Sequence, residues 1–263
     1  SGQLSGQLSG QLSGQLQAQG RWPALSISAD LRASALQVGA LRATRMHAQV
    51  QAGPDAHAAL AAQLDVEQAS INAWPVDTLQ LRLDGSLAEH RLTLDVQSPL
   101  RPPAWTDPWL GGSASASGSQ MLVRTKGRWQ SAEAPNVWLP GRWLGQGLEV
   151  EARGGSGGAN GAAWLRARDL RLQLQFDEQG RVQAASAEPG RIEALGAALR
   201  WTDAQWRAGS ATAPTQTTLD AQLEPLPIAP WLTRLHPAAG LGGDLTLTGH
   251  ARLALGAHVD ADV

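Results

Sequence analysis

The six histidines of this sequence are its side chains best suited to acid–base catalysis or metal binding. They occupy positions 47, 57, 90, 236, 250 and 258, and none belongs to an H-E-x-x-H pair or a calcium-binding loop. His90 falls in a predicted turn, and His250 and His258 stand beside polar residues. Solvated positions explain these histidines better than metal ligation, so we predict no metal site.

Other motifs of catalysis or cofactor binding are also missing. The chain contains no cysteine, which excludes disulfides, thiolate nucleophiles and cysteine-ligated metals. The stretch RGGSGGANG (153–161) lacks the Lys-Ser/Thr of a phosphate-binding loop and is typical of a linker. No G-x-S-x-G motif occurs, and the carboxylates are spread along predicted polar strand faces. We therefore predict no catalytic residues and no cofactor, and we do not expect an enzyme.

The charge of the chain is nearly balanced. It has 21 basic and 23 acidic residues, a formal net charge of −2. Such a balance creates no long-range field that would attract nucleic acid, and we expect no nucleic-acid partner. The apolar runs are far shorter than the ~18–20 residues that cross a bilayer as a helix.

The eleven tryptophans are the unusual group, because they stand against one phenylalanine and no tyrosine. Trp129, Trp138 and Trp143 cluster in the sequence, as do Trp201 and Trp206. Two interpretations remain open at this point. The indoles pack at the ends of a sheet or under loops, or they border an apolar ligand channel or interface.

The elements that must position these side chains are predicted to be strands, because apolar and polar residues alternate along much of the chain. In the clearest case Leu79, Leu81 and Leu83 alternate with polar residues, and the pattern continues through Gly85. We predict a strand that runs to Leu87, a turn over 88–91, and a return strand ended by Pro99.

The same alternation recurs around residues 25–31, 170–176, 219–223 and 245–255. Strands with one apolar face, separated by turn residues, indicate an all-β antiparallel meander. Only APWLTRLHPAAG (229–240) suggests a short helical turn. The apolar face is predicted to carry Leu4, Leu8, Leu25, Ile27, Leu79, Leu81, Leu83, Leu87, Leu92, Leu94, Val96, Leu170, Leu172, Leu174, Phe176, Leu219, Leu223, Leu245, Leu247 and Leu253.

Two flexible stretches divide the chain without a change of composition around them. A Pro/Gly/Ser-rich loop covers residues 99–119, and the glycine-rich interruption covers 153–161. Residues 1–98 and 120–263 are therefore predicted to be two segments of one continuous sheet. The chain ends inside an alternating segment, so we expect a fragment of a longer protein.

The chain opens with four copies of Ser-Gly-Gln-Leu. Read as a strand, the repeat places Leu and Gly on one face and Ser and Gln on the other. Sixteen extended residues would span ~53 Å, much longer than an ordinary strand. We therefore expect a bend or a hairpin turn inside the repeat, with only part of it in the sheet. A partly disordered leader is the alternative.

Two stretches resemble a known family. LDAQLEPLPIAPWLTRLHPAAGLGGDLTLTGHARL (219–253) is similar to the repeating unit of the translocation and assembly module family TamB. LQLRLDGSLAEHRLTLDVQSP (79–99) resembles the hairpin of the same family. The family's membrane anchor and its C-terminal region have no counterpart here. The resemblance extends to AsmA-like and bridge-like lipid-transfer proteins.

The resemblance implies an elongated, curved sheet that forms a taco-shaped trough with an apolar interior. It also implies a periplasmic segment that bridges the inner and outer membranes of a Gram-negative bacterium. Phospholipid would be the cargo, a TamA-type outer-membrane barrel the partner, and an absent anchor the link to the inner membrane. We expect glycines to leave room beside the leucines, where each buried acyl methylene gains ~0.8 kcal/mol. The alternatives are a scaffold for outer-membrane protein or autotransporter assembly, a closed β-solenoid, and an enzyme.

Overall fold

The structure is a computed structural model. It describes residues 8–21, 24–38, 41–71, 74–100, 118–131, 140–154, 163–210, 213–229, 231–232, 244–255 and 259–262. Several predictions lie outside these residues, namely those for Leu4, Trp138, His236 and His258 and for most of the 99–119 loop and the 153–161 interruption.

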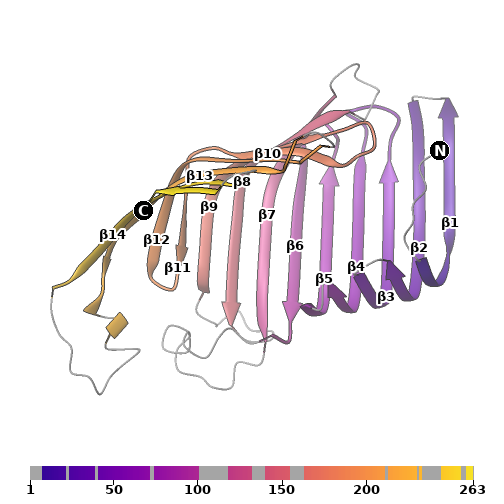
Figure 1. Cartoon of the computed structure of the whole chain (residues 1–263). Coiled ribbons are helices and arrows are strands. Elements are labelled where there is room, and N and C mark those ends of the chain that lie inside the picture. The colour runs from indigo at the N-terminus through magenta and orange to yellow at the C-terminus, as the bar shows by residue number, and fades with distance from the viewer. Residues whose placement is uncertain are drawn as a thin grey trace.

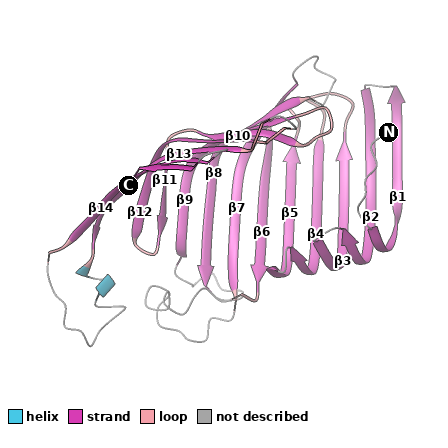
Figure 2. Ribbon diagram, viewed as in Figure 1, coloured by secondary structure: helices cyan, strands magenta, loops and turns pink. Residues whose placement is uncertain are grey.

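The described residues form one antiparallel sheet of fifteen strands, which confirms the all-β prediction. Sequential strands are neighbours in the sheet, except that β10 and β11 lie end to end between β9 and β12. Figure 1 shows the strands side by side in a single layer, and Figure 2 shows that strands make up most of the described chain, with very little helix. The strands are β1 (Leu8–Arg21), β2 (Ala24–Val38), β3 (Leu41–Ala52), β4 (Leu60–Ile71), β5 (Trp74–Gly85), β6 (His90–Ser98), β7 (Ser119–Ser131), β8 (Gly141–Gly154), β9 (Ala163–Phe176), β10 (Val182–Ala187), β11 (Gly190–Ala194), β12 (Ala197–Arg207), β13 (Gln216–Pro227), β14 (Thr246–Leu255) and β15 (Val259–Asp262).

The apolar alternation changes phase at one position in each of β2, β3, β4 and β5. In β4, Val66 and Ala69 belong to the same apolar cluster, while Glu67 and Gln68 between them are both exposed. Gln68 and Ala35 have φ of 49° and 50°, the left-handed region. The strand register places Ala35, Thr44, Gln68 and Asp77 opposite one another. The irregularity is therefore a line that crosses four strands.

A second line crosses β8, β9 and β12. Ala167 and Leu170 of β9 share an apolar cluster across an exposed pair, Arg168 and Asp169. Asp169 has a φ of 55°, and Gly147 of β8 has a φ of 58°. Irregular positions bend their strands. In Figure 1 the lower ends of β2–β5 curl, and the upper ends of β8–β13 turn away from the plane of their lower ends.

The β5–β6 turn lies two residues earlier than predicted, over residues 86–89 and not 88–91. β5 ends at Gly85 and β6 begins at His90, so Leu87 lies in the turn and not in a strand. Gly85 has a φ of 133°, and an added Cβ would lie 2.4 Å from the Glu89 carbonyl oxygen. Ser86 closes the turn, since its N–H donates to the Glu89 carbonyl at 2.7 Å and its Oγ accepts from the Glu89 N–H at 3.1 Å.

The described part of the opening repeat contains no hairpin. Residues 8–21 form one strand, and its pairing with β2 shifts by one residue between Ser9 and Gln11. Of the two expected alternatives, this register shift fits a bend, and residues 1–7 of the repeat lie outside the described residues. Near residue 230 the Leu232 N–H donates to the Ile228 carbonyl at 2.9 Å, which is a helical turn where one was predicted.

The core of this single layer is shallow. Seven of its twelve buried apolar residues are alanines, such as Ala167 at 3% and Ala221 at 2% exposure. No described side chain is both large and fully buried. A sheet with one apolar face and no second layer leaves its larger side chains partly in contact with solvent.

Candidate functional site: the apolar face

The candidate site is the apolar face of the sheet, and its centre is a row of paired residues. Starting at Gly14 of β1, each residue of the row is the register partner of the next, and every one is apolar or glycine. The row crosses thirteen strands and consists of Gly14, Leu31, Ala48, Leu64, Leu81, Leu94, Val123, Val150, Ala167, Ile192, Leu199, Leu223 and Gly249. Twelve strand spacings make it about 58 Å long.

A second row of the same kind runs beside it. Its members are Leu12, Ala33, Met46, Val66, Leu79, Val96, Met121, Ala152, Leu165, Ala194 and Ala197. We call the two rows together the apolar stripe. No charged or hydrogen-bonding side chain interrupts the stripe, so an apolar ligand would meet the same chemistry along its whole length.

The stripe remains accessible to solvent. Leu81, Leu94, Val123 and Val150 are each only partly buried, although all four lie in the middle of the sheet. Complete burial of a leucine or valine side chain gains roughly 1.5–3 kcal/mol relative to exposure. A ligand that covered the stripe would therefore gain part of this free energy at each residue that it contacts.

Indoles occupy the space above several glycines of this face. An added Cβ would lie 2.4 Å from Trp143 at Gly127 and at Gly145, 2.4 Å from Trp129 at Gly141, and 2.4 Å from Trp201 at Gly190. The expectation that glycines leave room for a ligand is wrong at these positions. Gly249 does have open space, since the nearest atom is 3.9 Å away.

Trp129, Trp143 and Trp201 thus pack on the apolar face of the sheet itself. Trp129 pairs with Trp143 in the register and packs against Phe176 in a tilted arrangement, at 5.1 Å between ring centroids. The Trp201 Nε1–H donates to the Glu188 carbonyl at 2.8 Å. These rings cover the apolar face above the second line of bending.

His90 is buried and not solvated, which corrects the prediction made from the sequence. Only 4% of it is exposed, and it is the first residue of β6. The Trp143 Nε1–H donates to His90 Nε2 at 2.9 Å, so Nδ1 carries the proton that is shared with the Ser86 carbonyl at 3.0 Å. The two hydrogen bonds hold the ring in one neutral tautomer. His250, by contrast, is exposed and pairs with Asp220 at 2.8 Å.

Fifteen of the residues expected on the apolar face are buried or partly buried, and their contact with lipid stays a prediction. They are Leu25, Ile27, Leu79, Leu81, Leu83, Leu92, Leu94, Val96, Leu170, Leu172, Leu174, Phe176, Leu219, Leu223 and Leu253. Leu245 and Leu247 were expected on the same face but are 63% and 47% exposed. Leu8 is the first residue of β1. The sequence reasoning missed Ala33, Met46, Val66, Val123, Val150, Ile192 and Leu199, which belong to the stripe.

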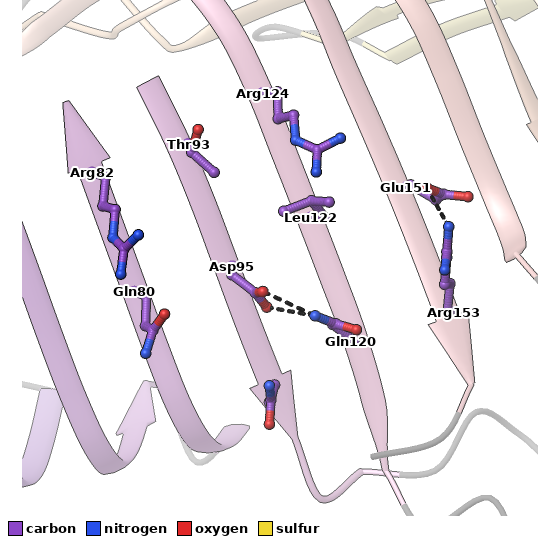
Figure 3. Close-up of a pocket in the computed structure, with 10 residues that line it drawn as sticks. Gln80, Arg82, Thr93, Asp95, Gln120, Leu122, Arg124, Glu151 and Arg153 are labelled. Atoms are coloured by element: carbon purple, nitrogen blue, oxygen red, sulfur yellow. Dashed lines mark hydrogen bonds and ion pairs between the residues drawn. The ribbon is translucent and has the colours of Figure 1, made fainter. Parts of the chain in front are cut away.

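The polar face carries the described depressions. The one in Figure 3 has a volume of about 590 Å³ and lies over β5–β8. Ion pairs order part of it, since Arg153 donates to Glu151 at 3.0 Å and thereby lowers the pKa of that carboxyl. Within the described residues, no group of three or more His, Cys, Asp or Glu side chains could hold a metal ion.

Comparison with known proteins gives one family. Residues 2–131 match the family model described as the N-terminal domain of TamB, a range that contains the 79–99 hairpin but not the 219–253 stretch. No curated protein and no solved structure matches the chain. In the part of the chain that the structure describes, no helix is long and apolar enough to cross a membrane. Residues 2–131 match the N-terminal domain of this family, which belongs to the Gram-negative envelope. The chain is therefore a member of the TamB family.

Proposed function

We propose that this chain is a segment of a periplasm-spanning protein whose apolar face carries phospholipid acyl chains between the inner and outer membranes. The observation that carries the proposal is the apolar stripe, which is continuous across the sheet and partly exposed along most of its length. The driving force for binding is that each acyl methylene removed from water gains ~0.8 kcal/mol. Neighbouring positions of the stripe are chemically alike, so the binding free energy changes little from one position to the next and an acyl chain can move along the stripe.

The two lines of bending support a trough with an apolar interior. At each line two consecutive side chains point to the polar side, as Glu67 and Gln68 do in β4. In the trough that we propose, the polar face is the convex one and the stripe lies inside the curve. The polar exterior would keep the segment soluble in the periplasm. A TamA-type barrel at the outer membrane and an anchor at the inner membrane are the partners that this function requires.

Photo-crosslinking tests the proposal with neighbouring residues of one strand. A photoreactive amino acid replaces Leu81 in the stripe or, as the control, Arg82 on the opposite face. Each protein is mixed with phospholipid vesicles and irradiated, and captured lipid is identified by mass spectrometry. We expect capture from position 81 and little from position 82. Arg82 also lines the depression of Figure 3, so Leu174 and Gln173 of β9 form the deciding pair, and equal capture from positions 174 and 173 would contradict the proposal.

A second candidate function, a scaffold for assembling outer-membrane strands, is favoured by β1. This strand is fourteen residues long, ends the sheet, and leaves Leu12 and Leu16 64% and 70% exposed. A free strand edge can bind an extended peptide by backbone pairing. A proline at Gln15 or Leu16, whichever directs its N–H outward, should abolish capture of a barrel-strand peptide under this alternative. It should leave lipid capture at position 81 unchanged.

A further inference from the structure

We propose that the depression on the polar face of β5–β8 binds a hydroxyl-bearing organic phosphate. The ligand would be either a soluble phosphorylated polyol or the headgroup of a lipid. The site lies on the face opposite to the apolar stripe, so it is independent of the acyl-chain function proposed above.

Two unpaired guanidinium groups stand at one end of the depression. The register places Arg82 of β5 opposite Thr93 of β6, and Thr93 opposite Arg124 of β7. Both arginines are exposed, and neither forms a hydrogen bond or ion pair within the described residues. Figure 3 shows them on either side of the Thr93 hydroxyl, all three in the depression. Two arginines about 10 Å apart across two strand spacings, with a hydroxyl between them, suit a phosphate group.

Several other arginines of the sheet are held by carboxylates. Arg45 pairs with Glu67, Arg171 with Glu188 at 3.1 Å, and Arg252 with Asp220 at 3.0 Å. Glu149 is the register partner of Arg124, yet no ion pair joins them. Because the arginines of the depression are not neutralised by the fold, they retain their full capacity to bind an external anion.

The other end of the depression suits hydroxyl groups. Gln80, Gln97 and Gln120 supply amides that both donate and accept, and Asp95 is an acceptor held by two hydrogen bonds from Gln120 at 3.0 and 2.9 Å. Leu122 is the one apolar side chain among the lining residues, and Figure 3 shows it beside Arg124 on β7. A volume of about 590 Å³ is within the usual range for small-molecule sites.

Calorimetric titration of the 263-residue chain at low salt tests the site with four probes. These are glycerol 3-phosphate, glycerol, inorganic phosphate, and vesicles of phosphatidylcholine with or without phosphatidylglycerol. Arg82→Gln and Arg124→Gln should each weaken binding of glycerol 3-phosphate by 10- to 100-fold, as expected for charge-assisted hydrogen bonds. Glu149→Gln should strengthen it several-fold, because a repelling carboxylate is removed.

Arg128→Gln is the matched control, because Arg128 is an exposed, unpaired cation of the same strand and does not line the depression. Binding of the soluble probe supports a soluble ligand, and selective binding of phosphatidylglycerol vesicles with the same arginine dependence supports a headgroup. Absence of binding to all probes would overturn the proposal. An equal loss in Arg128→Gln would overturn it too, since the effect would then be one of net charge. If glycerol bound as tightly as glycerol 3-phosphate, the proposal would also be overturned, because the phosphate group would then contribute nothing to the affinity.

Discussion

Substitution of Gly127 by alanine tests whether the indole of Trp143 is packed onto the sheet as tightly as the structure indicates. The new Cβ would lie 2.4 Å from both Trp143 Nε1 and His90 Nε2, closer than any real contact. Gly127 itself has an ordinary backbone conformation, so the methyl group alone causes the effect. It must displace the indole and break the 2.9 Å hydrogen bond between Trp143 and His90.

The magnitude follows from two contributions. Forcing a methyl group into a filled space costs about 1–3 kcal/mol. Loss of the hydrogen bond adds about 0.5–1.5 kcal/mol, and more if the buried histidine nitrogen finds no new partner. We therefore expect Gly127→Ala to lower the free energy of unfolding by about 2–4 kcal/mol. Gly249→Ala is the control, because open space surrounds that position and alanine is no worse than glycine in a strand.

Urea unfolding followed by circular dichroism measures both variants, and a double-mutant cycle identifies the cause. In a Trp143→Leu background the methyl group has a smaller neighbour, so Gly127→Ala should cost at least 1 kcal/mol less than in the wild type. Wild-type stability of Gly127→Ala would refute the reasoning. An equal cost in both backgrounds would assign the effect to His90 Nε2, which lies equally close to the new methyl group, and not to the indole.

Three further predictions concern the bends, the turns and the buried histidine. Ala35→Gly should raise the free energy of unfolding by up to about 1 kcal/mol, because Ala35 has a φ of 50° that glycine adopts without strain; Ala33→Gly, in regular strand, should lower it. Hydrogen bonds from the backbone of Arg181 and from its neighbours hold the pKa of Asp177 at about 2. Since the folded-state pKa is depressed, this carboxylate contributes stability above pH ~4, and the contribution is lost as the pH falls toward 2. Urea titrations of the wild type and Asp177→Asn should therefore differ at pH 6 and converge at pH 2, and a constant difference would contradict the assignment. His90→Leu should lower the free energy of unfolding by about 1–3 kcal/mol, because the Trp143 indole N–H loses its acceptor; a melting temperature equal to that of the wild type would count against the buried hydrogen bond.

The alternation of apolar and polar residues was enough to predict the sheet and most of its apolar face. Leu79, Leu81 and Leu83 alternate over a long enough stretch to define both the strand and its orientation. The end of that strand was harder to place, because Gly85 and Leu87 continue the pattern. Only the closed turn, with Ser86 hydrogen-bonded to Glu89, shows that the chain reverses two residues earlier.

Residues near the lines of bending escaped the sequence reasoning for a definite reason. In β3 Ala43 and Met46 face the same side, although their spacing of three residues breaks a period of two. A left-handed residue in a neighbouring strand has no signature of its own when it is Ala35 or Gln68 and not glycine. The phase change could be recognised only after the register aligned the irregular positions of adjacent strands.

The sequence by itself determined that this chain forms strands with one apolar face, because a period of two is a local property of the backbone. It determined neither the continuity of the stripe nor the contents of the space above the glycines. Those depend on which residues the sheet brings together, and the hydrogen bond between His90 and Trp143 joins residues that are 53 positions apart. The tertiary structure decided that leucine and valine rows stay open to solvent, while indoles fill the glycine positions beside them.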